Sequence, residues 1–212
     1  MTIRFEIIML IILIGLHMLE ITRRVVIVGV YFLMLITTGT ANDYILSKVL
    51  EEEGETKLAP LYFIGAYLFF MVSNLIAPLA KFSEKWMMAS ASLAYAFGYF
   101  TEFLLFGSSQ TMKYVLICVG ASLGGWFSGF LWLGMGRYIH KACHAFDKVD
   151  EKGHYYGTFN SIYFLNNIAG GIVVTFGLQL FSHQNYFLLL TGIAVLAFLF
   201  GAVAIRNINY EE

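Results

Sequence analysis

The chain has 212 residues, of which 59% are hydrophobic, 17% aromatic and 13% charged, and its mean hydropathy is +0.73. A soluble domain is about 45 to 50% apolar and about 25% charged, so this composition excludes an ordinary soluble protein and indicates lipid surroundings. The formal net charge of −1, without any basic stripe, excludes a nucleic-acid-binding protein.

The first apolar stretch, residues 7 to 19, lies between Glu6 and Glu20. It is shorter than the roughly 20 residues that a membrane-spanning helix needs, and it lacks the small-residue cleavage site of a secretory signal peptide. We therefore assign residues 1 to 24 to an N-terminal segment that forms an interfacial or buried helix before the first span. The alternative is that residues 7 to 19 insert as an additional helix.

Six apolar runs of spanning length follow, and we predict an all-α membrane protein with six transmembrane helices in residues 25 to 206. Four runs carry no charge, whereas the first contains Asp43 and the third contains Glu102. A short polar tail, residues 207 to 212, ends the chain. The predicted spans cover residues 25–47, 58–80, 86–107, 114–136, 155–181 and 185–205.

Lysine and arginine residues gather on one side of these spans. Ten of the 13 fall on that side together with both termini, whereas Lys48, Lys57 and Lys113 fall on the other. Short loops rich in lysine and arginine stay on the cytoplasmic or matrix-like side. We therefore expect both termini there, in a plasma membrane or an organelle membrane such as the mitochondrial inner membrane.

Glycines are concentrated in the fourth span, and the spacings 120/124 and 125/129 place small residues on one helix stripe. Such stripes let helices approach closely in lipid, so we predict packing inside the bundle or against a partner, with the lining of a solute path as the alternative. Asn166, Gly170 and Gly171 repeat the pattern in the fifth span. The fourth-span glycines are Gly120, Gly124, Gly125, Gly129, Gly134 and Gly136.

Glu102 is the most distinctive polar residue, because an acid within a span costs on the order of 2.5 to 3.5 kcal/mol on insertion. It is either a proton or cation site, or a buried hydrogen-bonded group, or an acid near the interface. If it serves coupling, Asn74, Asn166 and Asn167 are the side chains expected to face the same pathway. Asp43, beside Asn42, is expected to be an ordinary interfacial acid near the end of the first span.

Histidines and acids cluster after the fourth span. His140, Cys143, His144, Asp147 and His154 have helical spacing that could gather a soft divalent metal, but no second cysteine pair completes a tetrahedral set. We therefore expect no metal and no cofactor other than structural lipids. The chain also lacks a nucleophile elbow, a P-loop, a zinc-protease helix motif and a dinucleotide fingerprint, so we expect no enzyme activity.

The run 129–139, GFLWLGMGRYI, and the run 153–159, GHYYGTF, carry a family resemblance. They resemble the Unc-ninety-three-like branch of the major facilitator superfamily, a family of ion-channel regulatory type. Arg137, at the end of the first run, is expected to reach the headgroups or the helix C-terminus. The matching positions are Leu131, Trp132, Gly136, Tyr138, Lys152, Gly153, Tyr155, Gly157 and Phe159.

The resemblance implies one half of a major facilitator transporter, built as two inverted three-helix repeats. Two polar positions of the family's fourth span are apolar here, Leu133 and Met135, which weakens a solute site. A half-length unit also lacks the second wall of a central cavity. The resemblance therefore implies a non-catalytic accessory or structural subunit that packs against other integral membrane proteins and lipids, in a channel or an organellar, for example respiratory, assembly. The alternative is a half-transporter that acts as a homo- or heterodimer.

Overall fold

The computed structural model describes residues 2 to 208, and side chains from residue 20 to residue 208. This part of the chain is 87% helix and contains no strand, so the all-α prediction is confirmed. The elements are α1 (Thr2–Glu52), α2 (Leu58–Ile76), the 3-10 turn η1 (Ala77–Leu79), α3 (Glu84–Leu105), α4 (Gln110–Ala145), the 3-10 turn η2 (Val149–Glu151), α5 (Lys152–Tyr163), α6 (Asn166–Leu180) and α7 (His183–Ala204).

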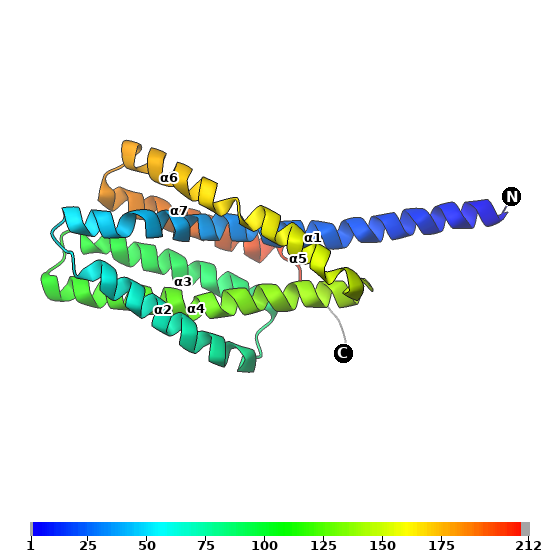
Figure 1. Cartoon of the computed structure of the whole chain (residues 1–212), viewed down its shortest axis with the longest axis horizontal. Helices are drawn as coiled ribbons and strands as arrows, with labels where there is room; N and C mark the ends of the chain where they lie inside the picture. The colour runs from blue at the N-terminus through cyan, green and yellow to red at the C-terminus, as the bar shows by residue number, and fades with distance from the viewer. Residues whose placement is uncertain (1, 209–212) are drawn as a thin grey trace.

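The helices form an elongated bundle in which successive helices run in opposite directions, except that α6 continues in the direction of α5 (Figure 1). α3 packs against α4 and α7, α2 packs against α4, and α5 and α6 pack along α1. α1 makes few contacts with α2 and α4. The helices are therefore less tightly packed between α1, α2 and α4 than elsewhere in the bundle.

Five helical segments between residues 20 and 204 are long and apolar enough to cross a membrane. They are 20–52, 58–79, 110–145, 149–180 and 183–204, and they match five of the six predicted spans. The remaining predicted span corresponds to α3, which has 22 residues and so a length of about 33 Å at 1.5 Å per residue. α3 is less apolar because it carries Ser90, Ser92, Thr101 and Glu102, of which all but Ser90 are buried in the bundle.

The N-terminal segment is not a separate helix, contrary to the prediction for residues 1 to 24. α1 runs without a break from Thr2 to Glu52, and its first part extends along the same axis beyond the other helices (Figure 1). No proline or glycine pair interrupts residues 19 to 28, so nothing in the sequence ends the helix at the predicted boundary. The polar tail at 207 to 212 lies mostly outside the described residues.

The fifth predicted span is divided into α5 and α6, a break that the hydropathy pattern does not predict. α5 ends at Tyr163 and α6 begins at Asn166. The Asn166 side chain donates a hydrogen bond to the Tyr163 carbonyl oxygen (2.6 Å) and accepts one from the Thr40 hydroxyl on α1 (2.7 Å). This side chain therefore satisfies backbone that the break exposes and ties the junction to α1.

Two glycines of α4 allow α2 to approach closely. A Cβ atom on Gly125 would overlap the carbonyl group of Ala66, and one on Gly129 would overlap the hydroxyl of Ser73. A third glycine of α4, Gly120, faces α3. A Cβ atom on Gly120 would lie 3.4 Å from the Cα atom of Gly98. These contacts support the packing interpretation of the stripe and place its use inside the bundle.

The other predicted glycines are used in different ways. Gly134 also faces α3, and Gly170 lies against Thr40 of α1. In contrast, a Cβ atom on Gly124 or Gly171 would meet no other atom within 4 Å. Gly124 lines a cavity, whereas Gly171 lies on the outer side of α6.

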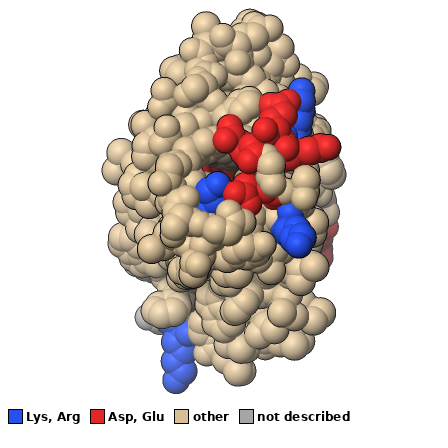
Figure 2. Space-filling view, turned by 90° about the vertical axis from the view of Figure 1, so that its left-hand side faces the viewer, with Lys and Arg blue, Asp and Glu red and all other residues tan. Residues whose placement is uncertain are grey.

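The two ends of the bundle differ in charge. One end carries the connection between α1 and α2, where Glu51, Glu52 and Glu53 are exposed, and Figure 2 shows the acidic side chains gathered there. The opposite end carries the end of α7 (Figure 1).

At this opposite end, Arg137 donates hydrogen bonds to the carbonyl oxygens of Pro78 (2.9 Å) and Ala80 (3.3 Å), so it holds the α2–α3 connection against α4.

Candidate functional site

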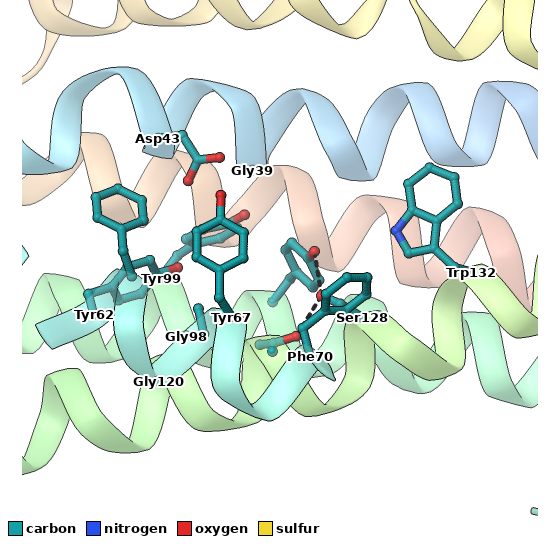
Figure 3. Close-up of a pocket in the computed structure, with 15 residues that line it drawn as sticks. Gly39, Asp43, Tyr62, Tyr67, Phe70, Gly98, Tyr99, Gly120, Ser128 and Trp132 are labelled. Atoms are coloured by element: carbon teal, nitrogen blue, oxygen red, sulfur yellow. Dashed lines mark hydrogen bonds between the residues drawn. The ribbon is translucent and has the colours of Figure 1, made fainter. Parts of the chain in front are cut away.

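A cavity of about 190 Å³ lies between α1, α2, α3 and α4, where α1 is only loosely packed against α2 and α4. Its walls are aromatic and small side chains, seven of the fifteen lining residues being aromatic (Figure 3). The lining residues are Gly39 and Asp43 of α1, Tyr62, Phe63, Ala66, Tyr67 and Phe70 of α2, Tyr95, Gly98 and Tyr99 of α3, and Gly120, Gly124, Gly125, Ser128 and Trp132 of α4.

Asp43 is the charged residue of this lining. Its carboxylate points from α1 toward the hydroxyl of Tyr67 on α2 (Figure 3), and it makes no hydrogen bond or ion pair with any side chain from residue 20 to residue 208. Asp43 is nine residues before the end of α1, which is about 14 Å along the helix axis. It therefore lies inside the helix rather than in its last turn.

Other polar groups of the lining are already paired. The hydroxyl groups of Tyr95 and Ser128 share a hydrogen bond of 2.8 Å, and the hydroxyl of Tyr99 accepts one from Thr38 (3.1 Å). These bonds fix two tyrosine rings in the wall. The carboxylate of Asp43 is therefore the strongest acceptor that remains available in the cavity.

Glu102 lies behind this wall, buried with 1% of its surface exposed. Its Oε1 atom accepts a hydrogen bond of 3.1 Å from Nδ2 of Asn42, and the same Nδ2 atom lies 3.4 Å from the Tyr62 hydroxyl. Asn42 therefore connects Glu102 to the cavity lining. In this chain, the geometry of Glu102 matches the buried, hydrogen-bonded alternative.

The other predicted coupling residues do not join Glu102. Asn74 is exposed on α2 and donates to the carbonyl oxygen of Phe70 (2.8 Å). Asn166 is buried at the α5–α6 junction, and Asn167 is exposed beside it. A single pathway lined by all four side chains is therefore not present within this chain.

The residues that carry the family resemblance lie in different surroundings. Trp132 lines the cavity, and Leu131, Tyr138 and Tyr155 are buried in the core. The carbonyl oxygen of Gly136 accepts a hydrogen bond from Tyr156 (3.0 Å), which joins α4 to α5. Gly153 and Gly157 are exposed on the outer side of α5.

The histidine cluster does not converge. Nδ1 of His140 lies 2.6 Å from Nζ of Lys152, the rings of His140 and His144 are in contact, and Cys143 is buried. No group of three or more histidine, cysteine, aspartate or glutamate side chains within the described range has a geometry that could hold a metal ion.

The sequence analysis does not predict the cavity, although the spacing of its lining residues along each helix is a signal for it. Its residues recur at four-residue spacing on each helix, as in 39/43, 62/66/70, 95/99 and 120/124/128/132. This is the spacing of one helix face. Aromatic and small residues on that face are equally typical of a packed core, so the spacing alone does not distinguish a cavity from a core.

Comparison with protein-family models, curated proteins and solved structures finds no match for this chain.

Proposed function

We propose that this chain is a non-catalytic multi-pass membrane protein that packs against transmembrane helices of other membrane proteins, as an accessory or structural subunit of a larger complex. The observation that carries the proposal is a pair of small-residue stripes on the outer side of α5 and α6. Both helices belong to a segment apolar enough to span the membrane, of which only 17% is buried in its most apolar window.

The stripe on α5 consists of Gly153, Gly157 and Ser161, which are all exposed and four residues apart. A Cβ atom on Gly153 or Gly157 would meet no other atom within 4 Å. Small side chains in this spacing are the usual surface at which membrane helices pack closely. Among the described residues, no helix occupies this surface.

The stripe on α6 consists of Asn167, Gly171 and Thr175. The side chain of Asn167 is exposed near the middle of the spanning segment, and it forms no hydrogen bond within residues 20 to 208. Burying an unpaired amide in hydrocarbon costs roughly 4 to 8 kcal/mol on the cyclohexane scale, so a protein partner that pairs with Asn167 stabilises the chain in the membrane. The partner we propose is therefore another integral membrane protein rather than lipid alone.

The helix arrangement supports the proposal that the chain is a half-unit of the major facilitator type. α2 packs against α4 in the same way that α5 and α6 pack against α1, and α3 pairs with α7. Two inverted three-helix repeats, α1–α3 and α4–α7, give this pattern of pairs. On this proposal α3 also spans the membrane, which brings the number of spans to six, and both termini lie on the lysine- and arginine-rich side of the membrane.

One observation favours the alternative, a half-transporter of major facilitator type that acts as a homo- or heterodimer. The cavity with Asp43 lies between α1, α2, α3 and α4, and a second unit could close it from outside. Two positions of α4 that are polar in the family are, however, Leu133 and Met135 in this chain, and neither side chain lines the cavity. The accessory role requires no solute path and is the proposal that the α5–α6 stripes support directly.

The proposal is tested by blocking the stripes. In Gly157→Leu combined with Gly171→Leu, the new side chains point into open space, so the chain folds while a partner helix can no longer approach. We expect the variant to reach its membrane in normal amount and to be lost from the native complex. Gly192→Leu on α7 is the matched control, because Gly192 is also exposed and without neighbours within 4 Å. Complexes that retain the double variant would contradict the proposal.

A further inference from the structure

We infer that the cavity between α1, α2, α3 and α4 binds a small organic ammonium group. The inference goes beyond the proposed accessory role, because the site uses α1 to α4 and none of the residues of the α5–α6 stripes. Each can therefore fail without the other.

The charges of the cavity select a cation. The carboxylate of Asp43 projects into it without a protein partner among the described side chains (Figure 3). A second carboxyl group, that of Glu102, is connected to the lining residue Tyr62 by two hydrogen bonds through Asn42. No lysine or arginine is among the fifteen lining residues. An intramembrane acid without a basic partner is stabilised by a bound cation.

The aromatic walls select an organic cation over a metal ion. Tyr62, Tyr67, Phe63 and Phe70 on α2 and Trp132 on α4 surround the space beside the carboxylate. Alkylammonium groups bind over the faces of such rings. Hard metal ions need six or so oxygen ligands. This lining offers the carboxylate of Asp43 and the hydroxyl of Tyr67, since the hydroxyl groups of the other tyrosines and of Ser128 are hydrogen-bonded to protein.

The size and the opening of the cavity fit such a group. The volume of about 190 Å³ exceeds the roughly 150 Å³ of a cavity that holds benzene, so a small organic cation fits. Asp43 is exposed and Tyr67 has 66% of its surface exposed. The cavity therefore opens between α1 and α2, from which an ammonium group can enter.

Binding is measured with the purified full chain in nanodiscs by equilibrium dialysis of radiolabelled tetramethylammonium. We expect saturable binding that neutral 3,3-dimethylbutanol displaces poorly. Asp43→Asn is expected to weaken binding at least tenfold, and Asp150→Asn, which alters an exposed acid of η2, to leave it unchanged. Unchanged binding in Asp43→Asn, or displacement by potassium at equal concentration, would overturn the inference.

A second pair of variants tests the aromatic wall without touching a charge. Tyr67→Leu is expected to weaken binding, whereas Tyr67→Phe retains it, because the ring face and not the hydroxyl contacts the cation. Tyr67 is mostly exposed, so both variants keep the fold. Equal affinity in Tyr67→Leu and Tyr67→Phe would contradict this assignment of the wall, and absence of saturable binding to the unaltered chain would exclude the site.

The ammonium group has two sources, a free ion or the choline headgroup of a lipid, and the nanodisc composition separates them. If a choline headgroup occupies the cavity, tetramethylammonium binds more weakly in phosphatidylcholine than in phosphatidylglycerol nanodiscs. Equal affinity in the two lipids identifies a free ion. Both results support an ammonium site.

Discussion

Asn42 on α1 donates a hydrogen bond of 3.1 Å from Nδ2 to Oε1 of Glu102 on α3, while Oδ1 of Asn42 and Oε2 of Glu102 are both buried without a partner. The contact joins the two helices directly behind the aromatic cavity. It therefore couples the packing of the bundle to the wall of the candidate site. A buried acceptor without a donor costs about 1 to 3 kcal/mol, so this pair is also a site where substitution is informative.

Glu102→Gln keeps an acceptor for Asn42 and replaces the unpaired oxygen by a donor. We expect its thermal unfolding midpoint in detergent to equal or exceed that of the unaltered chain. Glu102→Ala removes the acceptor and is expected to destabilise by about 1 to 3 kcal/mol. If the chain is instead a half-transporter that uses Glu102 for coupling, Glu102→Gln abolishes cation-coupled flux in the active dimer.

Gly125 and Gly124 form a matched pair on α4. Gly125→Ala places a methyl group against the backbone of Ala66, and such overpacking typically costs about 1 to 3 kcal/mol. Gly124→Ala meets nothing within 4 Å and gains up to about 1 kcal/mol of helix propensity. We therefore expect opposite shifts of the unfolding midpoint. Similar shifts for both variants would contradict the α2–α4 contact.

The acidic end of the bundle should show a defined pH dependence. Hydrogen bonds from Lys113 (2.7 Å) and Gln110 (2.9 Å) lower the pKa of Glu55 from its ordinary value of 4.5. A carboxyl group with a lowered pKa stabilises the fold above its unfolded pKa, and this stabilisation is lost as the pH falls through the folded pKa.

Glu55→Gln is therefore expected to lower the unfolding midpoint slightly at pH 7, with the difference from the unaltered chain disappearing in acid below pH 4.5. Thermal unfolding between neutral and acidic pH measures the difference. Glu51→Gln, at an exposed position of the same connection, serves as the comparison. A difference that grows as the pH falls would have the wrong sign for this account.

Arg137 is expected to stabilise the α2–α3 connection. Arg137→Gln loses the hydrogen bonds to the carbonyl oxygens of Pro78 and Ala80, which we expect to cost about 1 to 2 kcal/mol because both bonds are partly exposed. Arg206→Gln removes an exposed arginine at the same end and should change the unfolding midpoint little. Faster proteolysis in the connection, residues 80 to 83, provides a second measurement.

Hydropathy predicts most of this fold because spanning helices are long, apolar and separated by short polar connections. Five of the six predicted spans coincide with helical segments that are long and apolar enough to cross a membrane, although the segment 110–145 ends nine residues beyond the predicted end at 136. Continuity is harder to predict, since the helix from Thr2 to Glu52 and the break before Asn166 depend on tertiary contacts. The break, for example, is stabilised by Thr40, which is more than a hundred residues away in sequence.

The candidate site was less predictable than the fold. The acid of α3 stood out because a charge in an apolar run is rare, yet Glu102 is buried against Asn42, while Asp43 faces the cavity. Which of two acids faces open space depends on how α1 packs against α2 and α4. Likewise, the α4 glycines were recognised as packing residues, but only the fold assigns them to internal contacts and leaves Gly157 and Gly171 unoccupied.

The measurement that tests the central proposal most directly is the native mass and protein composition of the particle that holds this chain after mild detergent extraction from its own membrane. The account predicts that the chain migrates with other integral membrane proteins in fixed stoichiometry, in a particle much larger than a dimer. Migration as a monomer, or as a dimer of itself or with one other six-span chain, would contradict the accessory-subunit proposal.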